Sequence, residues 1–60
     1  MKYRVRFKIT KNGGVMMEGF KVLNAINENH AKDAAMRAIL NQYVFTEDMK
    51  VTVYKPKFIG

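Results

Sequence analysis

The first eleven residues alternate between hydrophobic and basic side chains. The hydrophobic positions are Tyr3, Val5, Phe7 and Ile9, and the basic positions between them are Lys2, Arg4, Arg6 and Lys8. Successive side chains of a β-strand point to opposite faces, so this pattern predicts a strand from about Lys2 to Thr10. One face of that strand is expected to be apolar and to enter the core, and the other is expected to be cationic and to face solvent.

A tight turn is predicted directly after this strand, at Asn12-Gly13. Asn-Gly is favoured at the centre of a type I′ hairpin turn, where both residues need a positive φ. A second strand is then expected from Val15 to about Ala25, but its alternation of apolar and polar residues is imperfect. Either a β-bulge near Gly19 shifts the phase, or both faces of this strand are partly covered.

A helix is predicted from Glu28 to about Gln42, with Asn27 as its N-cap. Five small or branched apolar residues repeat at helical spacing and are expected to form the stripe that faces the core. They are Ala31, Ala34, Ala35, Ala38 and Ile39.

A second apolar group, formed by Met36, Leu40 and Tyr43, lies about 120–180° around the helix from Ala31, since each residue turns about 100°. Three interpretations are open for it. The group forms either a surface for self-association or a docking surface for another protein, or else the chain's own later hydrophobic residues cover it.

A third strand is predicted from Met49 to Lys55 and should end at Pro56, which cannot donate a backbone hydrogen bond. Met49, Val51 and Val53 are expected to face inward in this strand. The tail after Pro56 either packs back on the sheet or projects from it, and the pattern does not separate the two.

The predicted order of elements is β-β-α-β, in a single domain covering residues 1–60. The fold class is α+β, with one helix packed on one face of a three-stranded antiparallel sheet. A right-handed crossover through the helix would place the third strand beside the first and give the order 2-1-3. The first strand is then central.

Sixty residues without cysteine bury a modest core and have no disulfide to reinforce it. Self-association, as a homodimer, is a remaining route to stability. The chain shows neither the apolar run of a signal peptide nor that of a membrane span, so we expect an intracellular, cytoplasmic protein with no membrane contact.

The formal net charge is +6, and its distribution along the chain is uneven. Residues 1–11 hold five basic side chains and no acid, residues 50–57 hold three more basic side chains, and the middle holds three basic against five acidic ones. A basic surface of this kind favours polyanions, above all nucleic acid and then an acidic protein surface. Basic residues also protect the exposed edges of small sheets, and charge alone does not separate these roles.

Catalysis is not expected. The chain has no serine and no cysteine to act as a nucleophile. Its one histidine, His30, lies in the first turn of the predicted helix, where a structural or solvated role is far more common than a catalytic one. A lone histidine is also a poor metal site. We therefore expect no cofactor, no metal and no small-molecule substrate.

The function that these patterns favour is nucleic-acid binding by a small non-enzymatic module, through phosphate contacts on the solvent-facing side of the sheet. The candidate contact residues are Lys2, Arg4, Arg6, Lys8, Lys50, Thr52 and Tyr54. Only Tyr54 is expected to be an exposed aromatic on that side, so base stacking has less support. The alternative function is a small protein-interaction or inhibitor factor, with Met36, Leu40 and Tyr43 as its interface.

Overall fold

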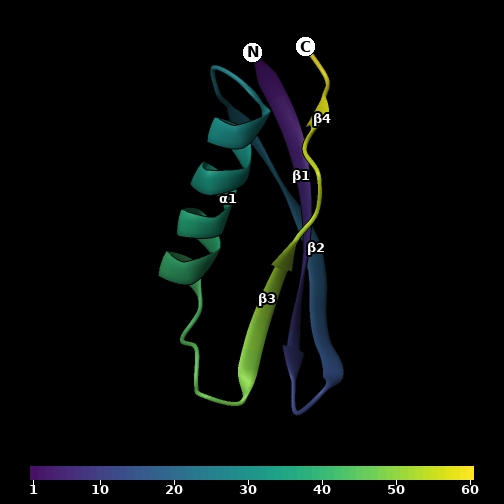
Figure 1. Ribbon diagram of the computed structural model, residues 1–60, viewed down its shortest axis with the longest axis vertical. Helices are drawn as coiled ribbons and strands as arrows, with labels where there is room; N and C mark the ends of the chain where they lie inside the picture. Colours follow the sequence, from purple (N-terminus) through teal and green to yellow (C-terminus); the bar gives the residue numbers. More distant parts are fainter.

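Strand β1 lies at the centre of the sheet in the computed structural model, which describes all residues from Met1 to Gly60. The elements are β1 (Lys2–Lys11), β2 (Gly14–Asn24), α1 (Glu28–Gln42), β3 (Met49–Val53) and β4 (Lys57–Phe58). The strand order is β2-β1-β3, every pairing is antiparallel, and α1 covers one face (Figure 1). The predicted α+β class, the order of elements and the central position of β1 are confirmed, and a short fourth strand is added.

The hairpin between β1 and β2 closes through Asn12 and Gly13, whose φ angles are 52° and 80°. These positive values are those of the predicted type I′ turn. The β-bulge in β2 lies elsewhere than expected. Thr10 is opposite Val15 whereas Ile9 is opposite Met17, so the extra residue is Met16, and the register runs unbroken past Gly19.

Gly19 has a steric role instead. It lies opposite Phe7 on the face of the sheet that α1 covers, and a Cβ at this position would lie 3.2 Å from Phe7 Cζ. Because Phe7 is only 4% exposed, its ring has little freedom to move aside. The absence of a side chain at Gly19 therefore makes room for a core aromatic.

The last two strands lie end to end along the same side of β1 (Figure 1). Pro56 interrupts them because it has no backbone N–H to donate. The tail beyond it packs back on the sheet, since Ile59 N–H donates to the carbonyl of Lys2 (2.9 Å) and the Phe58 ring meets Tyr3 edge-on at 5.7 Å between centroids. Of the two arrangements that the sequence leaves open for the tail, the packed one is therefore the one observed.

Helix α1 begins as predicted, with the Asn27 side-chain oxygen accepting a hydrogen bond from His30 N–H at 2.8 Å. Its buried residues are Ala31, Ala35 and Ile39. They are four residues apart, and a row of that spacing drifts around the helix by about 40° at each step. The expectation that Ala38 faces the core is therefore wrong, because the contact stripe has moved away from its side of the helix and leaves it exposed.

The core has nine buried hydrophobic residues, and β1 supplies four of them. These four are Tyr3, Val5, Phe7 and Ile9. The others come from α1, from β3 and from the segment before the helix, whereas β2 contributes only half-buried neighbours. The opposite face of the sheet has no covering layer, and its side chains point to solvent.

Candidate functional site

The outer face of the sheet, opposite α1, carries the predicted row of basic side chains on β1. Lys2, Arg4 and Arg6 are exposed, and Lys8 is half-buried. They alternate with the core residues of the same strand, so the packing of the core also fixes where these cations point. Side chains two residues apart on a strand are separated by about 6.6 Å, so the row extends over most of the length of β1.

The neighbouring strands add to this row on the same face. Lys8 lies opposite Thr52 and Thr10 lies opposite Lys50, so both β3 residues flank the cations as expected. Tyr54 follows β3, its N–H donates to the Arg6 carbonyl at 2.9 Å, and the Arg6 guanidinium lies over its ring at 5.5 Å from the centroid. The structure thus brings together all seven residues predicted from the sequence.

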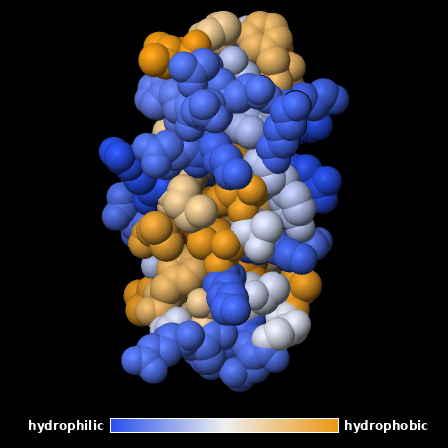
Figure 2. All heavy atoms as spheres, viewed as in Figure 1, coloured by the Kyte–Doolittle hydropathy of each residue, from blue (hydrophilic) through white to orange (hydrophobic).

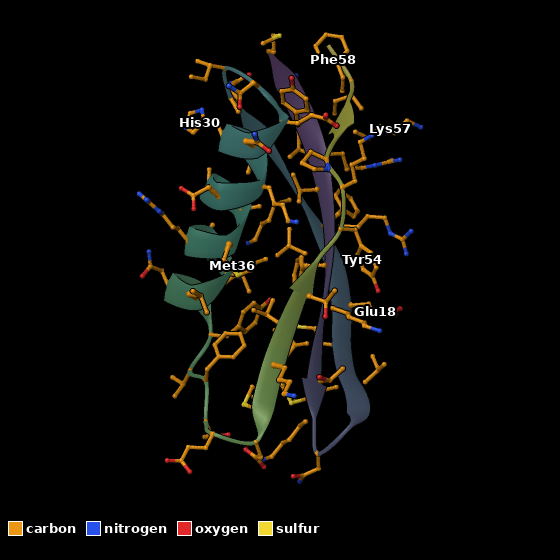
Figure 3. The ribbon with its side chains drawn as sticks, viewed as in Figure 1. Glu18, His30, Met36, Tyr54, Lys57 and Phe58 are labelled. Carbon is orange, nitrogen blue, oxygen red and sulfur yellow. The ribbon has the colours of Figure 1, made fainter.

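The residues of this face that the sequence prediction misses include an exposed aromatic and a further cation. Phe20 lies directly opposite Arg6 and is 59% exposed, and Lys57 of β4 lies directly opposite Arg4. Figure 3 shows Lys57, Tyr54 and Glu18 on the side of the sheet away from α1. The outward direction of Phe20 depends on the bulge at Met16, and the position of Lys57 depends on the return of the tail. The residue pattern specifies neither of these features.

Hardly any negative charge opposes the cations of the outer face. The one acidic residue there is Glu18, opposite Lys8, and it makes no ion pair with Arg4 or Arg6. The molecule's single ion pair joins Arg37 and Asp33 on α1 at 3.2 Å. The basic groups of β1 are therefore free to contact a ligand.

Lys21 belongs to the other face and does not join this site. It is half-buried on the covered side of β2, and its ammonium group donates to the side-chain oxygen of Gln42 at the end of α1. This contact attaches the otherwise sparsely covered β2 to the helix.

The second candidate surface, formed by Met36, Leu40 and Tyr43, is largely covered by the chain itself. Met36 and Tyr43 are half-buried and pack against the core, together with Phe45 from the following loop, while Leu40 stays 49% exposed. Figure 2 shows apolar side chains gathered where the end of α1 approaches β3. The reason is the drift of the contact stripe, which turns Met36 and Tyr43 toward the sheet near the end of the helix.

His30 closes the start of the helix. The ring Nδ1 of His30 accepts a hydrogen bond from the backbone N–H of Ile26 at 3.1 Å. The backbone N–H of His30 donates to the Asn27 side-chain oxygen. No group of three or more potential ligating side chains is arranged to hold a metal ion. A shallow hollow of about 250 Å³ lies on the far side of the molecule from the basic face, between Asn29, Lys32, Asp33 and Met36.

The acidic turn before β3 contains a carboxyl whose pKa is lowered, that of Asp48. A hydrogen bond from the Thr46 hydroxyl lowers the pKa of Asp48, and the positive charge of Lys11 acts in the same direction. The Asp48 carbonyl also accepts a hydrogen bond from Asn12 N–H at 3.0 Å. This turn therefore supports the hairpin tip and lies outside the basic face.

No helix of the chain has the length and apolar character needed to cross a lipid bilayer. Comparison of the chain with protein-family models, with curated proteins and with solved structures finds no match.

Proposed function

We propose that the protein is a non-enzymatic nucleic-acid-binding module that contacts phosphates with the outer face of its sheet. The observation that carries this proposal is the row of cations on β1, which forms no ion pair and of which only Lys8 is half-buried. Lys50 and Lys57 extend the positive surface on the adjoining strands. Because β1 is the central strand, its cations do not serve to protect an exposed strand edge.

The chemistry of the row suits a phosphate backbone. Side chains about 6.6 Å apart are separated by a distance similar to that between neighbouring phosphates on an extended strand. Arginine can bind a phosphate through two parallel hydrogen bonds, and lysine contributes a compact charge. Contacts of this kind depend little on base sequence and weaken as salt concentration rises.

The test is a binding titration against unrelated DNA and RNA oligomers over a series of salt concentrations. We expect Arg4→Gln with Arg6→Gln to weaken binding and to reduce the slope of log K against log salt, by about 0.7–0.9 for each phosphate that the variant no longer neutralises. The control removes two positive charges from the helix, with Lys32→Gln and Arg37→Gln, and should leave most of the affinity.

Three results would contradict the proposed function. The first is no detectable binding at low salt, and the second is an affinity that does not respond to salt. The third is an equal loss of affinity in the outer-face and helix variants, because that result would reflect net charge and not a site.

A protein-interaction role remains the second candidate, and the exposed Leu40 is the observation in its favour. Val44, in the loop after α1, is a second exposed apolar residue, at 88%. A homodimer formed here should be detected as a mass that rises with concentration in light scattering. A monomer whose Leu40→Asp variant keeps its fold and all its binding would remove the support for this candidate.

A further inference from the structure

Phe20, Arg6 and Tyr54 form a line across the sheet, from β2 through β1 to the end of β3. Phe20 is opposite Arg6 in the β1–β2 register, and the Arg6 guanidinium covers the Tyr54 ring at 5.5 Å. Adjacent strands are about 4.8 Å apart, so the two aromatic side chains stand on either side of the cation row. The line crosses the row at its middle.

Phe20 is the unusual member of this line. It is 59% exposed in the middle of the most basic face, so more than half of its surface is open to solvent. Val22, two residues along the same face, is 50% exposed. The side chain of phenylalanine has no polar group. A ligand that covers its ring would therefore remove apolar surface from water, which favours binding.

The chemistry of a single strand matches this arrangement better than that of a duplex. In a duplex the faces of the bases are covered by their neighbours, and a protein reaches only their edges and the phosphates. In a single strand the faces are accessible and stack on aromatic rings or on the plane of an arginine guanidinium. Phe20 offers such a ring, and Arg6 held against Tyr54 offers such a plane.

We propose that the outer face selects single-stranded nucleic acid, with one base stacked on Phe20 and another on the Arg6–Tyr54 pair. This inference rests on the proposed function. The phosphate backbone follows the cations of β1, and bases turn sideways from it onto β2 and β3. Phosphate contacts supply affinity, and the stacked bases supply the preference for single strands over duplex.

The experiment compares an oligo-dT of about 15 nucleotides with a duplex of the same length, by fluorescence anisotropy at low salt. We expect Phe20→Leu to weaken binding of the single strand by at least about fivefold and to leave duplex binding unchanged. The salt slope should also stay unchanged, because leucine removes a π-face but no phosphate contact. Val22→Ala is the matched control, since it trims an exposed apolar residue of the same strand and face.

A second variant reports the stacking directly. The chain has no tryptophan, so Phe20→Trp introduces a single one at the proposed stacking position. Its fluorescence should be quenched when oligo-dT saturates the protein, and its affinity should equal or exceed that of the natural chain.

Three results would each overturn the stacking inference. Phe20→Leu could bind the single strand as tightly as the natural chain does, or the fluorescence of Phe20→Trp could stay unquenched at saturation. The third result is equal affinity of the natural chain for single strand and duplex. The proposed function would survive those results if the Arg4 and Arg6 variants still showed weaker binding and a reduced salt dependence. Absence of all nucleic-acid binding would overturn both.

Discussion

At the scale of single residues, the close approach of Gly19 to Phe7 is a steric constraint that a substitution can test. A Cβ at Gly19 would approach Phe7 Cζ to 3.2 Å and Cε1 to 3.3 Å. The ring is buried, so it would have to shift against its neighbours. We expect Gly19→Ala to lower the free energy of unfolding by about 1–2 kcal/mol, as added volume does in a packed core. Urea denaturation measures this change.

The control for this prediction is Gly14→Ala. A Cβ at Gly14 would meet only the Lys11 carbonyl oxygen, at an ordinary contact distance of 3.7 Å. Replacing glycine by alanine at a compatible site restricts the unfolded chain and stabilises slightly. If both variants had the same free energy of unfolding, the steric role of Gly19 would be wrong.

At the scale of elements, the pairing of β4 with β1 sets two like charges against each other. Arg4 lies directly opposite Lys57, and like charges at directly opposite positions of a sheet repel. We expect Lys57→Thr to raise the free energy of unfolding by about 0.2–1 kcal/mol and to weaken nucleic-acid binding. Thermal unfolding and the binding titration together measure this opposition between stability and affinity.

Lys55→Thr is the matched variant for this pair. Lys55 is exposed in the segment between β3 and β4 and has no cross-strand partner, so removing its charge should not change stability. A Lys57→Thr protein that was no more stable than Lys55→Thr would show that repulsion at this pair is negligible.

The elements also show which parts of the molecule the sequence can predict. Strand β1 and helix α1 have regular periods and local signals, so their bounds follow closely from the residue pattern. The exposed face of β2 depends on one bulged residue. If Met16 paired with Ile9 and no bulge formed, the hairpin register would place Phe20 opposite Val5 and turn it toward the core. Because Met16 is bulged, Phe20 lies opposite Arg6.

The candidate site is likewise predictable in part from the sequence. Its cations alternate with core residues on one strand, and the hydrophobic pattern of that strand determines their direction. Phe20 and Lys57 reach the site through the bulge and through the return of the tail, which depend on pairings between residues distant in sequence. The local pattern of residues does not predict such pairings.

At the scale of the whole molecule, the two layers leave one side uncovered. The molecule measures 35 × 17 × 15 Å, and its longest dimension exceeds the other two about twofold. Figure 1 shows α1 on one side of the sheet and no element on the other. A long uncovered sheet face offers an extended surface for a linear ligand, in keeping with the proposed function.

The alternation along β1 has a further consequence, which concerns changes in chain length. Deleting Arg6 would place Val5 next to Phe7, so one half of the strand would have to turn its hydrophobic residues to solvent and its cations toward the helix. Inserting one residue between Gly13 and Gly14 would only lengthen a hairpin loop. We expect the deletion to abolish cooperative thermal unfolding and the insertion to preserve it, as followed by circular dichroism. An equally cooperative deletion variant would contradict this view. Strand β1 should therefore accept exchanges of one residue for another far more readily than the gain or loss of a single position.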